Sequence, residues 1–269
     1  MIYFITALHP EAKPLIDKYN LKKTDDGKFQ IYKNESIILI ITGTGQTNAA
    51  IAVTYLLTKY NCTNYDFVIN IGVCAGLKEA GNAYFINKIT DITTARTYYP
   101  DVFYNHSFDE SEIYSGSQIL SDGSYPLYDM EAASIYQSAI KFVSTDRIAF
   151  IKIISDNFSP NITGEILSEI IYAKIPLIND YISSCLEICS IDSNPLISND
   201  LLRIFDRLKV EFHCSVTMEN NLKGFLRYAF VTSIDTDNII KEMYANDIIP
   251  CKTKEEGKKA LEIFKQKLL

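Results

Sequence analysis

Short apolar runs alternate with amphipathic stretches along about the first two thirds of the chain. Runs of roughly four to eight residues rich in β-branched and aromatic side chains are typical of buried strands, whereas apolar positions three and four residues apart are typical of helices. The runs predict strands at residues 2–7, 29–33, 37–41, 66–71, 83–90, 111–120 and 147–154. Helical spacing predicts helices from residue 10, from the Gly43 loop to about 60, over 132–143, and over 163–188 with a kink at Pro176. This alternation is typical of an α/β protein.

The pattern changes at Ser190, and Asn194-Pro195 interrupts it. The chain beyond this point is predicted to be mostly helical, with helices at 201–212, 222–230, 239–244 and 253–269. The last of these begins with a capping box, Thr253-x-x-Glu256. We therefore divide the chain into a domain of residues 1–189 and a mainly helical C-terminal extension of residues 190–269, in which no set of residues indicates a particular chemistry.

The charge balance argues against one class of partner. The 269 residues carry 26 Lys and Arg against 33 Asp and Glu, a net charge of −7. The extension holds 12 of each sign, which leaves 14 basic and 21 acidic residues in the first domain. A surface that binds nucleic acid is usually basic, so nucleic acid is not an expected partner.

The N-terminal sequence and the cysteines indicate a reducing compartment. Met1 leads directly into an apolar strand rather than a secretory leader, and no apolar run approaches the ~20 residues that span a bilayer. We therefore expect a cytoplasmic protein without a membrane partner, whose cysteines are thiols. A zinc site built from Cys185-x3-Cys189 and His213-Cys214 is an alternative, but the spacing matches no common zinc motif. Neither a metal nor a cofactor is expected.

Carboxylates follow the predicted strands at positions where a ligand could bind. Glu11 comes just after the first strand, and Asp156 ends the last strand of the domain. Open α/β sheets bind ligands beyond the carboxyl ends of their strands. Glu131 stands at the start of a helix beside Met130, where a carboxylate could hold paired hydroxyls such as those of a ribose. The alternative is that Glu11, Asp129 and Glu131 only complement helix dipoles.

Two turns of small residues accompany these carboxylates. Gly43-Thr44-Gly45 follows one predicted strand, and Gly72-Val73-Cys74-Ala75-Gly76 follows the next. Glycine lets the backbone approach a ligand closely, and a helix N-terminus favours anions. The first turn matches neither a dinucleotide fingerprint nor a Walker loop. Two such turns in succession indicate one shared ligand.

In chain order the motifs are Ile5–Glu11, Gly43-Thr44-Gly45, Asn70–Leu77, Met130-Glu131-Ala132 and Ile154-Ser155-Asp156. Together they resemble the nucleoside phosphorylase/nucleosidase superfamily, and most of all the 5′-methylthioadenosine/S-adenosylhomocysteine nucleosidases, over about residues 1–185. The resemblance implies a three-layer α/β sandwich in which helices flank a central mixed sheet. It also implies a small-molecule nucleoside as ligand and a homodimer or higher homo-oligomer.

The resemblance assigns a role to each motif. It implies that Asp156 protonates N7 of a purine and that Glu11 activates a water molecule. Glu131 would bind the ribose hydroxyls, and Met130 would pack against the sugar. The base would lie beside Ile119 and Leu120, at the end of a predicted strand. From the small-residue turns we add the following substrate-binding candidates: Thr44, Gly72, Val73 and Cys74.

Some features depart from the family pattern and favour water over phosphate as the nucleophile. Val73 stands where the family usually carries a serine that contacts phosphate. No arginine adjoins the Gly43 loop, and the nearest cations along the sequence are Lys13, Lys33 and Lys59. A separate departure concerns substrate identity and activity rather than the nucleophile: the interval between residues 77 and 130 is shorter than usual, as if part of the substrate lid were missing.

We therefore predict hydrolysis of the N-glycosidic bond of a purine nucleoside, with 5′-modified adenosine among the candidate substrates. A purine or other nucleoside phosphorylase is the alternative enzyme. Two alternatives come from other classes of protein. The chain could be a non-catalytic nucleoside-binding sensor, or its extension could be a module that docks a partner protein.

Overall fold

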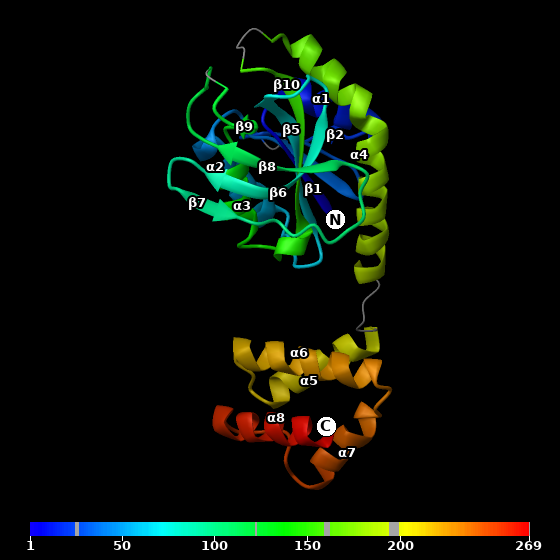
Figure 1. Cartoon of the computed structure of the whole chain (residues 1–269). Coiled ribbons are helices and arrows are strands. Elements are labelled where there is room, and N and C mark those ends of the chain that lie inside the picture. The colour runs from blue at the N-terminus through cyan, green and yellow to red at the C-terminus, as the bar shows by residue number, and fades with distance from the viewer. Residues whose placement is uncertain (25–26, 122, 159–161, 194–198, 269) are drawn as a thin grey trace. The chain divides into compact units, whose positions relative to one another are not determined.

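The structure of the chain is a computed structural model that describes all residues except 25–26, 122, 159–161, 194–198 and 269. It contains two compact units, Met1–Ile191 and Asp192–Leu269 (Figure 1). Within the described ranges, no helix has the length and apolar character required to cross a bilayer.

A mixed sheet forms the centre of the first unit, with ten strands in the described part of the chain. The strands are β1 (Ile2–Thr6), β2 (Lys22–Lys23), β3 (Gln30–Lys33), β4 (Ile37–Ile41), β5 (Phe67–Gly76), β6 (Ala83–Asp91), β7 (Arg96–Tyr98), β8 (Asp109–Ser115), β9 (Leu127–Asp129) and β10 (Ile148–Asp156). Their order is β10-β6-β8-β9-β5-β1-β4-β3-β2, with β7 paired to β6. Because β10 also pairs with β5, the five strands β10, β6, β8, β9 and β5 form a closed ring of paired strands.

Helices cover both faces of the sheet, which confirms the predicted three-layer sandwich. Helices α1 (His9–Lys18) and α4 (Gly164–Ser193) pack on one face, and α2 (Gln46–Lys59) and α3 (Ala132–Ala139) pack on the other. Successive side chains of a strand point to opposite faces. In β1, Ile2 and Phe4 accordingly join the cluster beneath α1 and α4, whereas Tyr3 and Ile5 join the cluster beneath α2 and α3.

The predicted elements differ from the structure at several boundaries. β5 continues through Gly72–Gly76, predicted to be a turn, because β10 and β9 pair with that part of the strand. The strand predicted at 111–120 is shorter in the structure: β8 ends at Ser115, and residues 116–120 lie outside any strand. The helix predicted over 163–188 is present as α4, with Pro176 inside it. A short helix η1 (Thr145–Arg147), which was not predicted, precedes β10.

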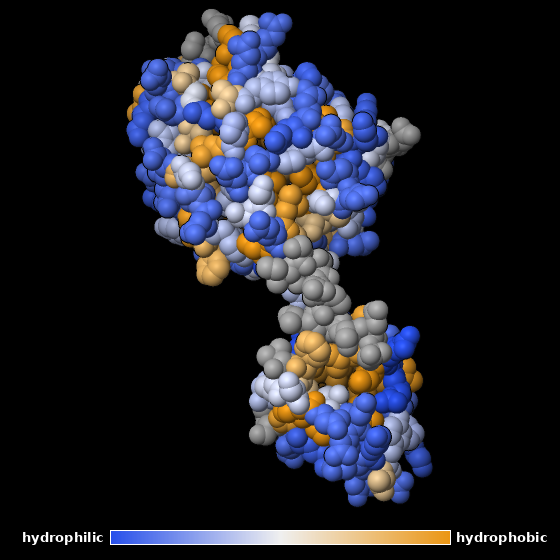
Figure 2. Space-filling view, turned by 90° about the vertical axis from the view of Figure 1, so that its right-hand side faces the viewer, coloured by the Kyte–Doolittle hydropathy of each residue, from blue (hydrophilic) through white to orange (hydrophobic). Residues whose placement is uncertain are grey.

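The second unit contains the helices α5 (Asn199–Glu211), α6 (Val216–Val231), α7 (Thr236–Ala245) and α8 (Lys254–Leu268). It has its own apolar core, which includes Phe212, Leu222 and Phe264. The predicted cap of the last helix is present: the Thr253 hydroxyl accepts a hydrogen bond from the Glu256 amide. On the face drawn in Figure 2, apolar side chains of this unit lie open among polar ones.

Candidate active site

A cavity of about 240 Å³ lies in the first unit, at one edge of the sheet. Strands β1, β5 and β10 run parallel, so their carboxyl ends meet at this edge. The cavity is lined by Ala7, Leu8, Glu11, Thr44, Val73, Cys74, Ala75, Ile119, Leu120, Tyr128, Asp129, Met130, Glu131, Ser155, Asp156, Phe158 and Ile162. The structure therefore brings all the candidate residues to one cavity except Gly72.

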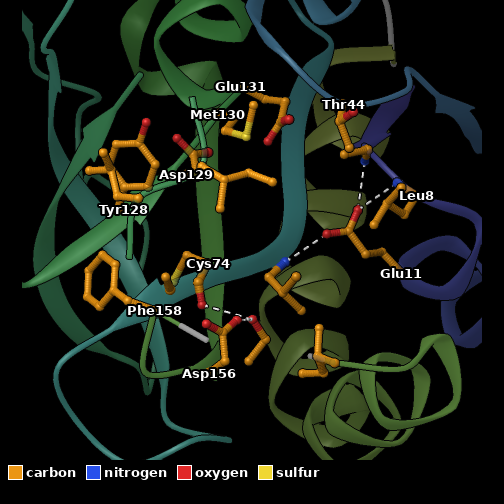
Figure 3. A pocket seen from close by; sticks show the side chains of 17 residues that line it. Leu8, Glu11, Thr44, Cys74, Tyr128, Asp129, Met130, Glu131, Asp156 and Phe158 are labelled. Atoms are coloured by element: carbon orange, nitrogen blue, oxygen red, sulfur yellow. Dashed lines mark hydrogen bonds between the residues drawn. The ribbon is translucent and has the colours of Figure 1, made fainter. Parts of the chain in front are cut away.

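The carboxylate of Glu11 is held by three backbone amides. Its Oε2 accepts hydrogen bonds from the amides of Ala7 (2.7 Å) and Leu8 (2.9 Å), and its Oε1 accepts one from Val73 (2.9 Å) (Figure 3). The side chain is buried. Burial raises the pKa of Glu11 above its ordinary value, although the amides and the Lys152 ammonium act in the opposite direction. A raised pKa makes this carboxylate a stronger base.

Gly72 makes room for this carboxylate. A Cβ at position 72 would lie 2.9 Å from Oε1 of Glu11, closer than such atoms approach. Gly72, predicted to contact the substrate, is not among the residues that line the cavity. The glycine acts instead behind the cavity wall, by leaving space for Glu11.

Glu131 faces the same cavity from the start of α3. Its Oε1 accepts a hydrogen bond from the Gly45 amide (2.7 Å), so the predicted glycine loop touches this carboxylate directly. Burial raises the pKa of Glu131 to about 7, and the negative charge of Asp129 adds to this effect. The Lys152 ammonium and the Gly45 amide act in the opposite direction. Near neutral pH, Glu131 therefore exchanges between its charged and neutral forms.

A buried ion pair lies beside these two glutamates. Nζ of Lys152 on β10 is 2.7 Å from Oδ2 of Asp129, and both side chains are almost fully buried. The same oxygen accepts a hydrogen bond from the Ala132 amide (3.0 Å). Within the described residues, Oδ1 of Asp129 has no hydrogen-bond partner, although Asp129 lines the cavity. This oxygen is itself buried from solvent.

Lys152 interacts electrostatically with all three of these acidic side chains. Burial alone would lower its pKa, but the carboxylates of Asp129, Glu131 and Glu11 outweigh that effect and raise it. Lys152 therefore carries a positive charge beside three acids. The sequence analysis missed Lys152 and treated Asp129 only as a helix-dipole acid. The signal that could have found Lys152 is a single charged residue inside the apolar run Ile148–Ile154.

Asp156 reaches the cavity from the end of β10. The pairing of β10 with β5 shifts register between Ile154 and Asp156, and such a bulge redirects the side chains that follow it. Asp156 is half-buried, and its Oδ2 accepts a hydrogen bond from the Ser155 hydroxyl (2.6 Å). Figure 3 shows Asp156, Glu11 and Glu131 on three sides of the cavity. Three acids thus face one space.

Apolar side chains form most of the rest of the wall. Met130, Val73 and Cys74 line the cavity as predicted, together with the unpredicted Phe158. Ile119 lines it too, but 74% of its surface is exposed because it stands in a connection beyond β8. In the described part of the chain, no cluster of three His, Cys, Asp or Glu residues is arranged to hold a metal ion.

Comparison with known proteins relates the first unit to one group of enzymes by fold. No family model matches the sequence, and no curated protein matches it. Among solved structures, the 5′-methylthioadenosine/S-adenosylhomocysteine nucleosidase of Helicobacter pylori, crystallised with butyl-thio-DADMe-Immucillin-A, matches with a TM-score of 0.57 and 15% sequence identity. The match covers 68% of this chain and 97% of that chain.

Two further structures match in the same way. The 5′-methylthioadenosine nucleosidase of Arabidopsis thaliana gives a TM-score of 0.56 at 17% identity, with 68% of this chain and 95% of that chain covered. The futalosine hydrolase of Helicobacter pylori gives 0.53 at 15% identity, with 68% and 97% covered. The chain therefore has the fold of the nucleosidases that its motifs resemble.

Proposed function

We propose that the protein hydrolyses the N-glycosidic bond of purine nucleosides, with 5′-modified adenosine as the first candidate substrate. The observation that carries the proposal is the arrangement of Glu11, Glu131 and Asp156 around one cavity. These acids stand at the strand ends of a fold shared with enzymes named as nucleosidases and as a futalosine hydrolase.

Each acid has a separate task in this reaction. Asp156 donates a proton to the leaving base, which takes up the electron pair of the broken bond between sugar and nitrogen. Glu11 accepts a proton from water, whose oxygen forms the new bond to C1′ of the sugar. Glu131 accepts hydrogen bonds from the ribose hydroxyls, and its negative charge stabilises the cationic sugar of the transition state.

The charges around the cavity favour water over phosphate. A phosphate dianion would meet Glu11, Glu131 and Asp129, whereas the Lys152 ammonium is already paired with Asp129. Val73 offers its amide to Glu11 and has no hydroxyl to offer a phosphate. The sequence analysis named Lys13, Lys33 and Lys59 as the nearest cations, and Lys152 is the cation that the structure places beside the acids.

The test is base release from a panel of nucleosides, measured with and without phosphate. The panel contains 5′-methylthioadenosine, S-adenosylhomocysteine, adenosine, inosine and futalosine. We expect free ribose or 5′-modified ribose as the sugar product, at a rate that added phosphate does not change. Ribose 1-phosphate as the main product would favour the phosphorylase alternative. Binding without any base release would favour the sensor alternative.

The pKa of Glu131 predicts how substrate binding depends on pH. Ribose hydroxyls donate to the charged carboxylate, and protonation removes that charge, so KM should rise as the pH falls through about 7. In Glu131→Gln this rise should disappear, because the amide does not titrate. The same variant should lose about 10- to 150-fold in kcat/KM, the value of a hydrogen bond to a charged group.

The control for this prediction is the matching 2′-deoxynucleoside. It lacks one hydroxyl that Glu131 is proposed to bind, so the substitution should cost it less than it costs the ribonucleoside. Equal losses for the two substrates, or a wild-type KM that stays constant between about pH 6 and 8, would remove Glu131 from the sugar site.

We also propose that the protein acts in the cytoplasm as a homodimer or higher homo-oligomer, and that residues 190–269 form a separate helical module. All six cysteines are free thiols, which fits a reducing compartment. Large apolar side chains are exposed on the first unit, including Ile51, Tyr99 and Phe103. Sedimentation of the full chain measures the oligomeric state.

A further inference from the structure

A segment without regular structure forms one wall of the cavity. Residues 116–120 follow β8, and Ile119 and Leu120 within them line the cavity. Ser117, Gln118 and Ile119 are exposed, and Leu120 is only half-buried, so the segment gains little from packing. Segments of this kind depend on a few hydrogen bonds to hold one conformation.

Strand β9 provides hydrogen bonds to this segment at two points. The carbonyl oxygen of Asp129 accepts from the Gly116 amide (3.0 Å). The Tyr128 hydroxyl donates to the carbonyl oxygen of Gln118 (2.5 Å), next to Ile119. The second bond therefore fixes the backbone directly beside the residues that face the cavity.

The residues around Tyr128 hold its ring in place and leave space for its hydroxyl to make this hydrogen bond. Its ring is buried and is stacked on Tyr125, which is stacked in turn on Tyr114. The hydroxyl passes over Gly116, where a Cβ would lie only 2.3 Å from the hydroxyl oxygen. Glycine at this position thus lets the hydroxyl reach Gln118, and the stacked rings keep Tyr128 in place.

We propose that Tyr128 is a positioning residue, whose hydroxyl holds the 116–120 segment and thereby sets how tightly the Ile119–Leu120 wall receives the base. The inference rests on the proposed function for the identity of the ligand. Tyr128 acts through the segment, because the hydrogen bond is made to backbone and needs no contact between the hydroxyl and the substrate.

Tyr128→Phe tests this role, because it keeps the ring and removes only the hydroxyl. We expect KM for the best nucleoside of the panel to rise about three- to tenfold, the effect of one lost hydrogen bond, while kcat changes less than about twofold. Amide hydrogen exchange of residues 117–121 should become faster by a similar factor, with exchange in β10 unchanged. Tyr114→Phe is the matched control, since it also removes a tyrosine hydroxyl, but from the residue at the other end of the stack.

The outcomes separate this inference from the proposed function. If the wild-type protein cleaves no nucleoside, the proposed function fails, and hydrogen exchange of the segment still tests Tyr128. Unchanged exchange in Tyr128→Phe overturns the inference whatever the activity. Faster exchange with an unchanged KM also overturns it, because the segment would then not control binding. An equal effect of Tyr114→Phe would assign the change to the stack rather than to the hydroxyl.

Discussion

Replacement of Asp156 by Asn should reduce kcat at least 100-fold while the protein stays folded and still binds nucleoside. The amide keeps the shape of the carboxyl group but cannot deliver a proton to the leaving base. General acid catalysis is worth roughly 10²- to 10⁴-fold, so most of the rate should be lost. Because Asp156 is half-buried at the end of β10, the substitution should alter the unfolding transition little.

The measurements for this variant are single-turnover base release and equilibrium binding of the same nucleoside. Asp109→Asn serves as the matched control, because Asp109 is exposed at the start of β8 and does not line the cavity. A variant at position 156 that keeps more than about a tenth of the wild-type rate would exclude Asp156 as the general acid.

Replacement of Lys152 by Met should lower the free energy of unfolding by about 3–5 kcal/mol, the usual cost of removing one partner of a buried ion pair. Methionine fills a similar volume, so the loss is electrostatic rather than a loss of packing. The substitution leaves the Asp129 carboxylate buried without its cation, beside Glu131 and Glu11. Urea denaturation at neutral pH, followed by circular dichroism, measures the change.

A second substitution separates charge from shape. In the background of Lys152→Met, the further change Asp129→Asn removes the unpaired negative charge and should restore part of the lost stability. The restored part is expected only if the pair acts through its charges. A double variant that is as unstable as the sum of the two single variants would show that Lys152 and Asp129 contribute independently.

The convergence of Glu11, Glu131 and Asp156 could be predicted from the sequence, because each follows a recognisable element. Glu11 and Asp156 lie at the carboxyl ends of apolar runs, and parallel strands bring such ends to one edge. In the structure all three acids line one cavity. Their roles in a reaction stay predictions.

The buried cation could not be predicted in the same way. Lys152 and Asp129 are separated in sequence, and only the pairing of β10 and β9 with β5 brings them together. Periodicity likewise could not show that Gly72 serves Glu11, because that close approach depends on the packing of α1 against the sheet. The predicted turn at Gly72–Gly76 was wrong for a related reason, since pairing on both sides keeps small residues in a strand.

The residues that line the cavity come from two kinds of structure, and these differ in how well they tolerate mutation. Some are held by the closed ring of five strands, and others belong to a connection outside it. Asp156 and Glu131 are attached to β10 and to the end of β9, which are held by neighbouring strands. Ile119 and Leu120 belong to the connection between β8 and β9. Substitutions or length changes in that connection can therefore reshape this wall of the cavity without moving the acids. A fold built in this way can acquire new substrates by mutation while its chemistry is retained.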